Sequence, residues 1–284
     1  MPTDANAALS GPDSTSHAHA ALFDEVAARK TGRHSEIPLD CTRQPPSRRA
    51  SFAFFDRWLA AQDLDGRHAL DLGCGRGEVS VQIARQGATV AGVDISPESL
   101  AKAAALAAHH GVADRIELGS GDAENLPFPD RSFDLAVSAG VMSFVAFDKV
   151  AEELARVMKR DGTAVLLDTL GHNPIANLGR RKSLARGRTT QYQVDNVMTA
   201  NHLDRLRACF GSVEVHVFDI ATVPMMLVEN VLLRIHPGLL KLTAPISAFL
   251  RFVDKGLLRI RPLRRYAFRI VVVLRWPRVR EEDT

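Results

Sequence analysis

Short apolar segments alternate with segments of helical periodicity from residue 66 to near the end of the chain. Buried strands read as nearly continuous apolar runs, whereas surface helices repeat their apolar residues every three to four positions. Strands joined by helices imply a parallel sheet covered on both faces, so the pattern predicts a doubly wound α/β fold. We expect helices at 78–86, 96–110 and 199–210, and strands at 69–72, 88–93, 115–118, 133–138, 163–168, 213–220 and 267–274.

The segments outside this alternation predict additions to the core. The polar start of the chain indicates a disordered tail, and the arginine-rich stretch 171–198 is interpreted as a loop. Before the core, the helix expected at 47–61 is the stronger of two, the weaker lying at 19–30. The expected boundaries are 1–19 for the tail, 20–65 for helices that cover the site, 66–221 for the core, 222–265 for a helical insertion, and 266–284 for the last strand and a charged tail.

The insertion has an apolar stripe along its second half and basic residues on the other side. Such a helix suits either a lid packed on the domain or a segment lying on an anionic membrane surface. We favour the lid, which is the commoner arrangement, and both interpretations suit an apolar or lipid-like substrate. The stripe consists of Ile246, Phe249, Leu250, Val253, Leu257 and Ile260, and the basic side of Arg251, Lys255 and Arg259.

Composition narrows the class of protein. The chain has 284 residues, of which 46% are hydrophobic, and this suits a globular protein with a sizeable core. Its three cysteines suggest no disulfide framework or metal-ligand set, so we expect a reducing, cytoplasmic location and no metal. Residues 231–280 hold twelve Lys and Arg against one acid, a net +11 in a chain of net +3, which leaves −8 for the rest. This asymmetry is typical of a protein that meets an anionic surface, and contact with the inner face of the membrane is one interpretation.

A glycine-rich turn after the first strand carries the clearest chemical signal. In an open α/β sheet, ligands bind beyond the carboxyl ends of the strands, and glycines allow close approach of the backbone. The turn runs through Asp71, Gly73, Cys74, Gly75 and Gly77, and the next residue is Glu78. It fails the dinucleotide pattern in both registers and lacks the Gly-Lys pair of a P-loop. Acids on either side of the glycines suit a cationic ligand better than a pyrophosphate.

Two further carboxylates follow the next strands. Asp94 ends the second strand, where a carboxylate can accept hydrogen bonds from both ribose hydroxyls, and the helix cap that it could otherwise provide is supplied by Ser96. Asp122 follows the third strand, close to where an adenine would lie. Together with Asp71, these acids favour a nucleoside ligand with a positive charge.

The segments ALDLGCGRGEVS, VAGVDIS, GDAENLPFPDRSFDLAVSAGV and VMKRDGTAVLLD resemble the class I S-adenosylmethionine-dependent methyltransferases. The resemblance covers 66–169 and is nearest to the branch of ubiquinone and menaquinone biosynthesis enzymes, which act on small molecules. It implies a seven-stranded Rossmann-like sheet whose last strand is antiparallel, with S-adenosylmethionine as cofactor. It also implies that Asp71 and Gly73–Gly77 hold the methionine part, Asp94 with Ile95 the ribose, Asp122 with Ala123 the adenine, and Ser138 the methionine end.

The expected reaction is transfer of the methyl group to a small, apolar or lipid-like acceptor, at oxygen rather than carbon or nitrogen. Many relatives have a histidine shortly after the fourth strand, where this chain has Ser143-Phe144. His172, which follows the fifth strand, is the candidate base for an acceptor hydroxyl, although it could equally shape the turn before Pro174.

Other functions stay open. An RNA or protein methyltransferase could use the basic C-terminal region, and a non-catalytic protein could bind S-adenosylmethionine without turnover. Nucleic acid is not the expected partner, because the basic segments lack interleaved aromatic residues. The pattern does not indicate an oligomeric state.

Overall fold

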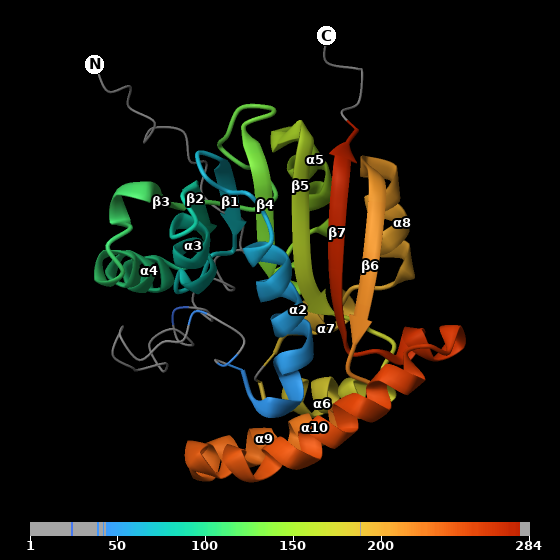
Figure 1. The fold of residues 1–284 in the computed structure, drawn as a ribbon. Coiled ribbons are helices and arrows are strands. Elements are labelled where there is room, and N and C mark those ends of the chain that lie inside the picture. Colours follow the sequence, from blue (N-terminus) through green and yellow to red (C-terminus); the bar gives the residue numbers. More distant parts are fainter. Residues whose placement is uncertain (1–23, 25–38, 40–41, 43, 188, 279–284) are drawn as a thin grey trace, which may run out of the picture.

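The computed structural model describes residues 44–187 and 189–278, together with Asp24, Leu39 and Thr42. The strands are β1 (His68–Leu72), β2 (Thr89–Asp94), β3 (Ile116–Ser120), β4 (Phe133–Ala139), β5 (Met158–Thr169), β6 (Phe210–Phe218) and β7 (Arg269–Pro277). They form one sheet in the order β3-β2-β1-β4-β5-β7-β6 (Figure 1). The pairs from β3 to β5 are parallel, and β7 is antiparallel to both β5 and β6. The predicted seven-stranded fold with an antiparallel last strand is therefore confirmed.

Helices cover both faces of the sheet. The covering helices are α2 (Arg49–Ala60), α3 (Glu78–Ala84), α4 (Pro97–His109), α5 (Phe147–Val157) and α8 (Ala200–Cys209). Successive residues of a strand point to opposite faces, so each strand contributes to two cores. On β1, Leu70 and Leu72 join the apolar cluster formed with α5 and α8. Ala69, which directly precedes Leu70, belongs to the cluster formed with α2, α3 and α4.

The predicted ends of the strands and helices differ from the observed ends by a few residues, with one larger change. The fifth strand begins at Met158 rather than 163, because α5 passes into it directly at Val157. The predicted start of the second core helix is confirmed: the Ser96 side chain accepts a hydrogen bond from the Ser99 amide, and Pro97 occupies the first turn of α4.

The prediction of a loop at 171–198 is wrong. This stretch contains α6 (Pro174–Leu184) and α7 (Gln191–Asp195). Asn173 caps α6 by accepting a hydrogen bond from the Ala176 amide, and Pro174 occupies its first turn. Thr190 forms a capping box with Gln193 at the start of α7. Both starts are encoded in the sequence, but the high arginine content made the segment look like a solvated loop.

At the N-terminal side, the helix predicted at 47–61 is present as η3 (Pro46–Arg48) followed by α2. The tail at 1–19 lies outside the described residues, and so does the helix predicted at 19–30, apart from Asp24. Asp24 accepts hydrogen bonds from the Ser96 hydroxyl and from the Glu98 amide, at the start of α4.

The C-terminal insertion forms a curved helical layer at one end of the molecule (Figure 1). Its elements are α9 (Val223–Ile235), η6 (Pro237–Leu239), α10 (Leu240–Leu257) and η7 (Arg261–Tyr266), and we call them together the C-terminal layer. It lies at the end of the sheet where the parallel strands have their carboxyl ends, next to α6. None of the described helices is long and apolar enough to cross a membrane.

The predicted apolar stripe of the insertion is only partly packed on the domain. Ile246, Phe249 and Ile260 are exposed to 52%, 64% and 50%, whereas Leu250, Val253 and Leu257 are half-buried. The positions of α10 that are fully buried include Thr243, Ser247 and Asp254. Helix α10 thus buries a polar face and leaves half of the predicted stripe exposed, and the lid interpretation stays a prediction.

Candidate functional site

A cavity of about 370 Å³ opens at the carboxyl ends of β1 and β2. Here the chain leaves β1, passes through the glycine turn and enters α3, while the loops after β2, β3 and β4 form the remaining walls. This is the position at which open α/β sheets bind ligands.

The glycine turn brings backbone close to the cavity. Gly73 has φ +69°, and a Cβ atom there would lie 2.2 Å from a methyl carbon of Val141. Gly77 has φ +82°, and a Cβ atom there would lie 2.9 Å from that of Ala103 on α4. Any other residue at either position would therefore be strained in its backbone and clash with a neighbour. Gly73 shapes the cavity wall, whereas Gly77 lets α3 pack against α4.

Asp71 is a buried carboxylate on the cavity wall. Its side chain is 3% exposed and accepts a hydrogen bond of 2.5 Å from the Ser80 hydroxyl. Burial raises the pKa of Asp71 to about 7, because the ionised form loses its water, and the charges of Asp94 and Glu78 act in the same direction. A cation in the cavity would restore the ionised form and would itself be attracted to it.

Asp94 lies at the end of β2, next to the glycine turn. Its Oδ2 accepts a hydrogen bond of 2.8 Å from the Gly75 amide, and its Oδ1 accepts one of 2.9 Å from the Ser96 amide. A carboxylate oxygen can accept two hydrogen bonds, so each oxygen can still receive a ligand hydroxyl. Burial raises the pKa of Asp94, while the backbone donors oppose the rise.

The loop after β3 supplies the third carboxylate. Asp122 Oδ1 accepts a hydrogen bond of 2.9 Å from the Glu124 amide, which fixes the turn. Glu124 in turn accepts hydrogen bonds from the Ala146 amide at 2.7 Å and from Lys149 at 3.1 Å. These bonds tie the loop after β3 to the start of α5, so both acids are held at the cavity.

The cavity is strongly acidic. Its described lining includes five carboxylates, Asp71, Glu78, Asp94, Asp122 and Glu124, against one guanidinium, that of Arg76. Arg76 lies 3.8 Å from Glu78 and so compensates only part of this charge. Such a wall favours a cation and disfavours a pyrophosphate.

Another part of the cavity lining is apolar, and most of its residues were not predicted from the sequence. It combines Phe52 of α2 with Val141, Phe144 and Val145 from the loop after β4. Buried Asp168 holds this loop by accepting a hydrogen bond of 2.9 Å from the Met142 amide. A Phe on an otherwise amphipathic helix looks like any core residue, so only the tertiary arrangement shows that Phe52 faces the cavity.

The structure brings eight of the ten predicted cofactor residues together around this cavity. The lining includes Asp71, Gly73, Cys74, Gly75, Asp94, Ile95, Asp122 and Ala123. The cofactor candidates Gly77 and Ser138 do not line it, and neither does His172, the predicted base.

Ser138 and His172 lie apart for different reasons. Ser138 pairs with Leu72 and Leu166 across the sheet, so its side chain lies on the face covered by α5 and α8. Its hydroxyl is buried without a partner among the described residues. His172 is exposed in the turn before α6, and the capping bond of that helix comes from Asn173.

Comparison with known proteins gives this site its context. Residues 70–166, which hold the turn and all three carboxylates after the strands, match a family model described as a methyltransferase domain. This part of the chain is similar to methyltransferase domains, in agreement with the predicted resemblance to the class I S-adenosylmethionine-dependent methyltransferases.

Two curated proteins match part of the chain. Sterol 4-C-methyltransferase strm-1 of Caenorhabditis elegans is 35% identical over 107 residues, 37% of this chain and 32% of that protein. Demethylmenaquinone methyltransferase of Lactobacillus johnsonii is 35% identical over 119 residues, 40% of this chain and 49% of that protein. The chain thus spans about a third to a half of the length of these curated relatives.

Among solved structures, the [4+2]-cyclase SpnF has a TM-score of 0.60 with 20% identity, covering 94% of this chain and 98% of that chain. This likeness extends over nearly the whole chain and shows the fold alone.

Proposed function

We propose that the chain binds S-adenosylmethionine in the acidic cavity and transfers its methyl group to a small, apolar or lipid-like acceptor. The observation that carries the proposal is the ring of carboxylates at the carboxyl ends of β1, β2 and β3, which lies within the methyltransferase domain.

The residues around the cavity fit this cofactor. Asp71 and the backbone of the glycine turn would hold the cationic methionine part, which explains a buried carboxylate without a basic partner. Asp94 would receive the ribose hydroxyls on the lone pairs that Gly75 and Ser96 leave open. Asp122 and Ala123 would lie against the adenine. When bound, S-adenosylmethionine supplies an electrophilic methyl group on a positively charged sulfur.

The apolar wall supports an apolar acceptor. Phe52, Phe144 and Val145 would exclude water and position the acceptor, and positioning of two reactants accounts for much of the rate in such a transfer. Oxygen is the proposed acceptor atom. Its proton would leave to a carboxylate of the wall or to water, because there is no His or Lys among the described lining residues. The sterol and quinone named in the two relatives agree with an apolar acceptor.

The first test is cofactor binding. Asp94→Ala should weaken S-adenosylmethionine binding at least about tenfold in titration calorimetry, because it removes a charge-assisted acceptor. The matched control is Glu117→Ala, which removes an exposed acid from the neighbouring strand β3. This variant should bind S-adenosylmethionine with the wild-type affinity. If the folded Asp94→Ala protein binds S-adenosylmethionine with unchanged affinity, Asp94 does not bind the ribose.

The second test finds the acceptor. The protein is incubated with methyl-labelled S-adenosylmethionine and cell extract, and the product is separated into lipid, small-molecule, RNA and protein fractions. We expect the label in the lipid or apolar small-molecule fraction. Label in RNA or protein would replace the proposed acceptor, and cofactor binding without any labelled product would favour a non-catalytic binding protein.

A further inference from the structure

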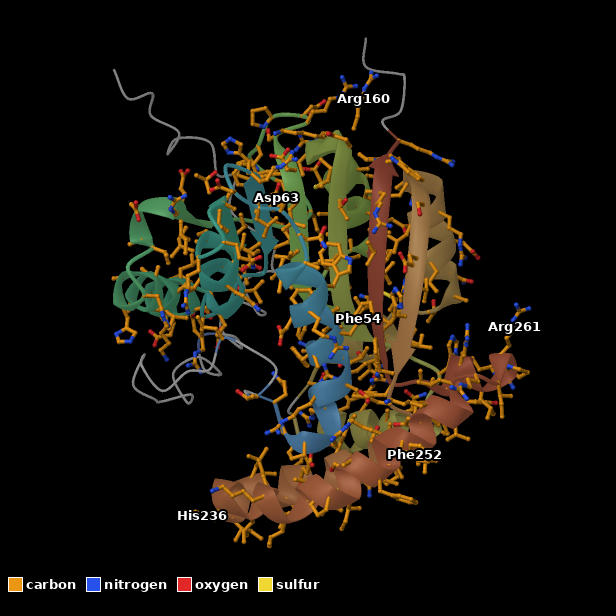
Figure 2. All side chains as sticks on the ribbon, viewed as in Figure 1. Phe54, Asp63, Arg160, His236, Phe252 and Arg261 are labelled. Atoms are coloured by element: carbon orange, nitrogen blue, oxygen red, sulfur yellow. The ribbon has the colours of Figure 1, made fainter. Side chains whose placement is uncertain are left out.

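The C-terminal layer has an outer surface of unusual composition. On α9, the exposed positions Leu227, Val231 and Ile235 recur at helical spacing and are 43%, 56% and 69% exposed. On α10, Leu242, Phe249 and Phe252 are 68%, 64% and 72% exposed. In Figure 2 the layer extends along one end of the molecule from His236, where α9 ends, to Arg261, which follows α10. Apolar exposure on this scale marks an interaction surface rather than scattered surface residues.

The inner surface of the layer explains why these residues stay outside. Glu229 of α9 is fully buried and accepts hydrogen bonds from the Ser47 amide at 3.1 Å, from Thr243 at 2.9 Å and from Ser247 at 3.2 Å. Asp254 of α10 accepts bonds from the amides of Ile220 and Ala221. The polar sides of both helices are thus fixed against the body. Rotation of either helix to hide its apolar side would break these hydrogen bonds and leave donors such as the Ser47 and Ile220 amides without acceptors.

The charge on the outer surface of the C-terminal layer indicates which kind of partner it binds. Between residues 220 and 268, both acidic residues, Glu229 and Asp254, are buried. The described basic side chains on the outside of the same stretch are Lys241, Lys255, Arg259, Arg261, Arg264 and Arg265. The exposed ionised side chains of this stretch, as far as they are described, are therefore all positive. A second copy of the chain on this surface would face like charges, whereas an anionic lipid surface complements both the apolar and the basic residues.

We propose that the C-terminal layer is a membrane-docking surface, which inserts the outer side chains of α9 and α10 into the interface of an anionic bilayer while the basic residues contact lipid phosphates. The layer is joined to the cavity side of the domain, because Arg251 donates to the Pro46 carbonyl, and Arg48 donates to Asn230 at 2.7 Å. Those contacts lie at the start of α2, the helix that carries Phe52 of the cavity wall. Docking therefore brings the apolar wall near the membrane.

The test is co-sedimentation of the full chain with vesicles, without cofactor or acceptor, so its outcome is independent of methyl transfer. We expect binding to vesicles that contain phosphatidylglycerol, and weaker binding to phosphatidylcholine alone or at high salt. Phe249→Gln combined with Phe252→Gln should reduce binding at least about tenfold, since two large apolar side chains are lost from the interface. Lys255→Glu with Arg259→Glu should reduce binding to the anionic vesicles by about tenfold or more.

Two matched controls keep the result specific. Trp276 is 60% exposed but lies on β7, so Trp276→Gln should bind as the wild type does. Arg160 is exposed at the opposite end of the molecule from the layer, and Arg160→Glu should leave binding unchanged (Figure 2). Failure of the wild-type protein to sediment with anionic vesicles would overturn the proposal. So would a dimer in sedimentation velocity that the two Phe substitutions disperse, because a second copy would then cover the surface.

Discussion

The sheet and the C-terminal layer distribute their side chains in opposite ways. In the sheet, apolar residues such as Leu70 and Val165 are fully buried, and Asp71 and Asp94 line the cavity at its carboxyl edge. In α10, Thr243 and Asp254 are buried, whereas Leu242 and Phe252 are exposed. The sheet is thus stabilised mainly by removal of apolar surface from water, and the inner side of the layer is stabilised by hydrogen bonds to two carboxylates.

The C-terminal layer is therefore not held to the domain by a continuation of the apolar core. A buried hydrogen bond contributes little net free energy to folding, but a buried donor or acceptor without a partner costs much more. The buried polar groups of the layer therefore fix the orientation of its helices more than they add to stability. The layer is held in one orientation, with its apolar side outward. The three predictions below test this contrast and the cavity.

The largest effect is expected at Glu229. Glu229→Ala should lower the free energy of unfolding by about 3–5 kcal/mol, because it leaves the donors of Ser47, Thr243 and Ser247 buried without an acceptor. Urea unfolding followed by circular dichroism measures the loss. Glu214→Ala removes an exposed carboxylate that pairs with Arg275 on the sheet surface, and it should change stability by less than about 1 kcal/mol. Equal losses in the two variants would mean that the polar interior of the layer has no special role.

An intermediate effect is expected at Asp71, where function and stability should oppose each other. The pKa of Asp71 is raised from 3.8 to about 7 by burial, so the folded state holds a proton that the unfolded state releases. The stabilising contribution of this proton is complete below pH 3.8 and is lost as the pH rises through about 7. Above that pH, the wild-type protein carries a buried charge.

Asp71→Asn removes this charge and keeps an acceptor for the Ser80 hydroxyl. Without cofactor, the variant should be about 1–3 kcal/mol more stable than the wild type at alkaline pH, and the difference should shrink towards pH 4. Thermal unfolding across this pH range checks the trend. With S-adenosylmethionine the wild type should gain stability and the variant should not. A variant that is still stabilised by the cofactor would remove Asp71 from the binding site.

The difference between the sheet and the C-terminal layer also explains which features could be predicted from the sequence. The sheet was predictable because its strands are continuous apolar runs and because the glycine turn sits after the first of them. The fold, the match to a methyltransferase domain and the start of α4 at Ser96 all followed from such local signals. Helix α6 was missed even though Asn173 and Pro174 form a cap, since a high arginine content also suits a loop.

The orientation of the C-terminal layer depends on residues that are distant in the sequence. An amphipathic pattern does not say which side turns inward, and here the answer lies in the bonds from Ser47 to Glu229, 182 positions apart. The apolar wall of the cavity likewise depends on Phe52 meeting the loop after β4. Alternation along β4 places the side chain of Ser138 on the face covered by α5 and α8, and this could be recognised only once the register was known.

The smallest effect is expected at His172, the residue that the sequence suggests as a base. Its side chain is exposed and does not line the cavity, and the turn that contains it is held by Asn173, which bonds to the Ala176 amide at 3.0 Å and to the Tyr266 carbonyl at 2.6 Å. His172→Gln should therefore keep turnover within a few-fold of wild type on the acceptor found in the extract experiment, whereas Asn173→Ala should destabilise the turn by about 1 kcal/mol. A true base would give a different result: turnover would fall by about 10²–10⁴-fold, with unchanged cofactor affinity. That outcome would show that the acceptor reaches beyond the described cavity to the start of α6. A small effect leaves the carboxylates of the cavity wall and water as the routes for the proton.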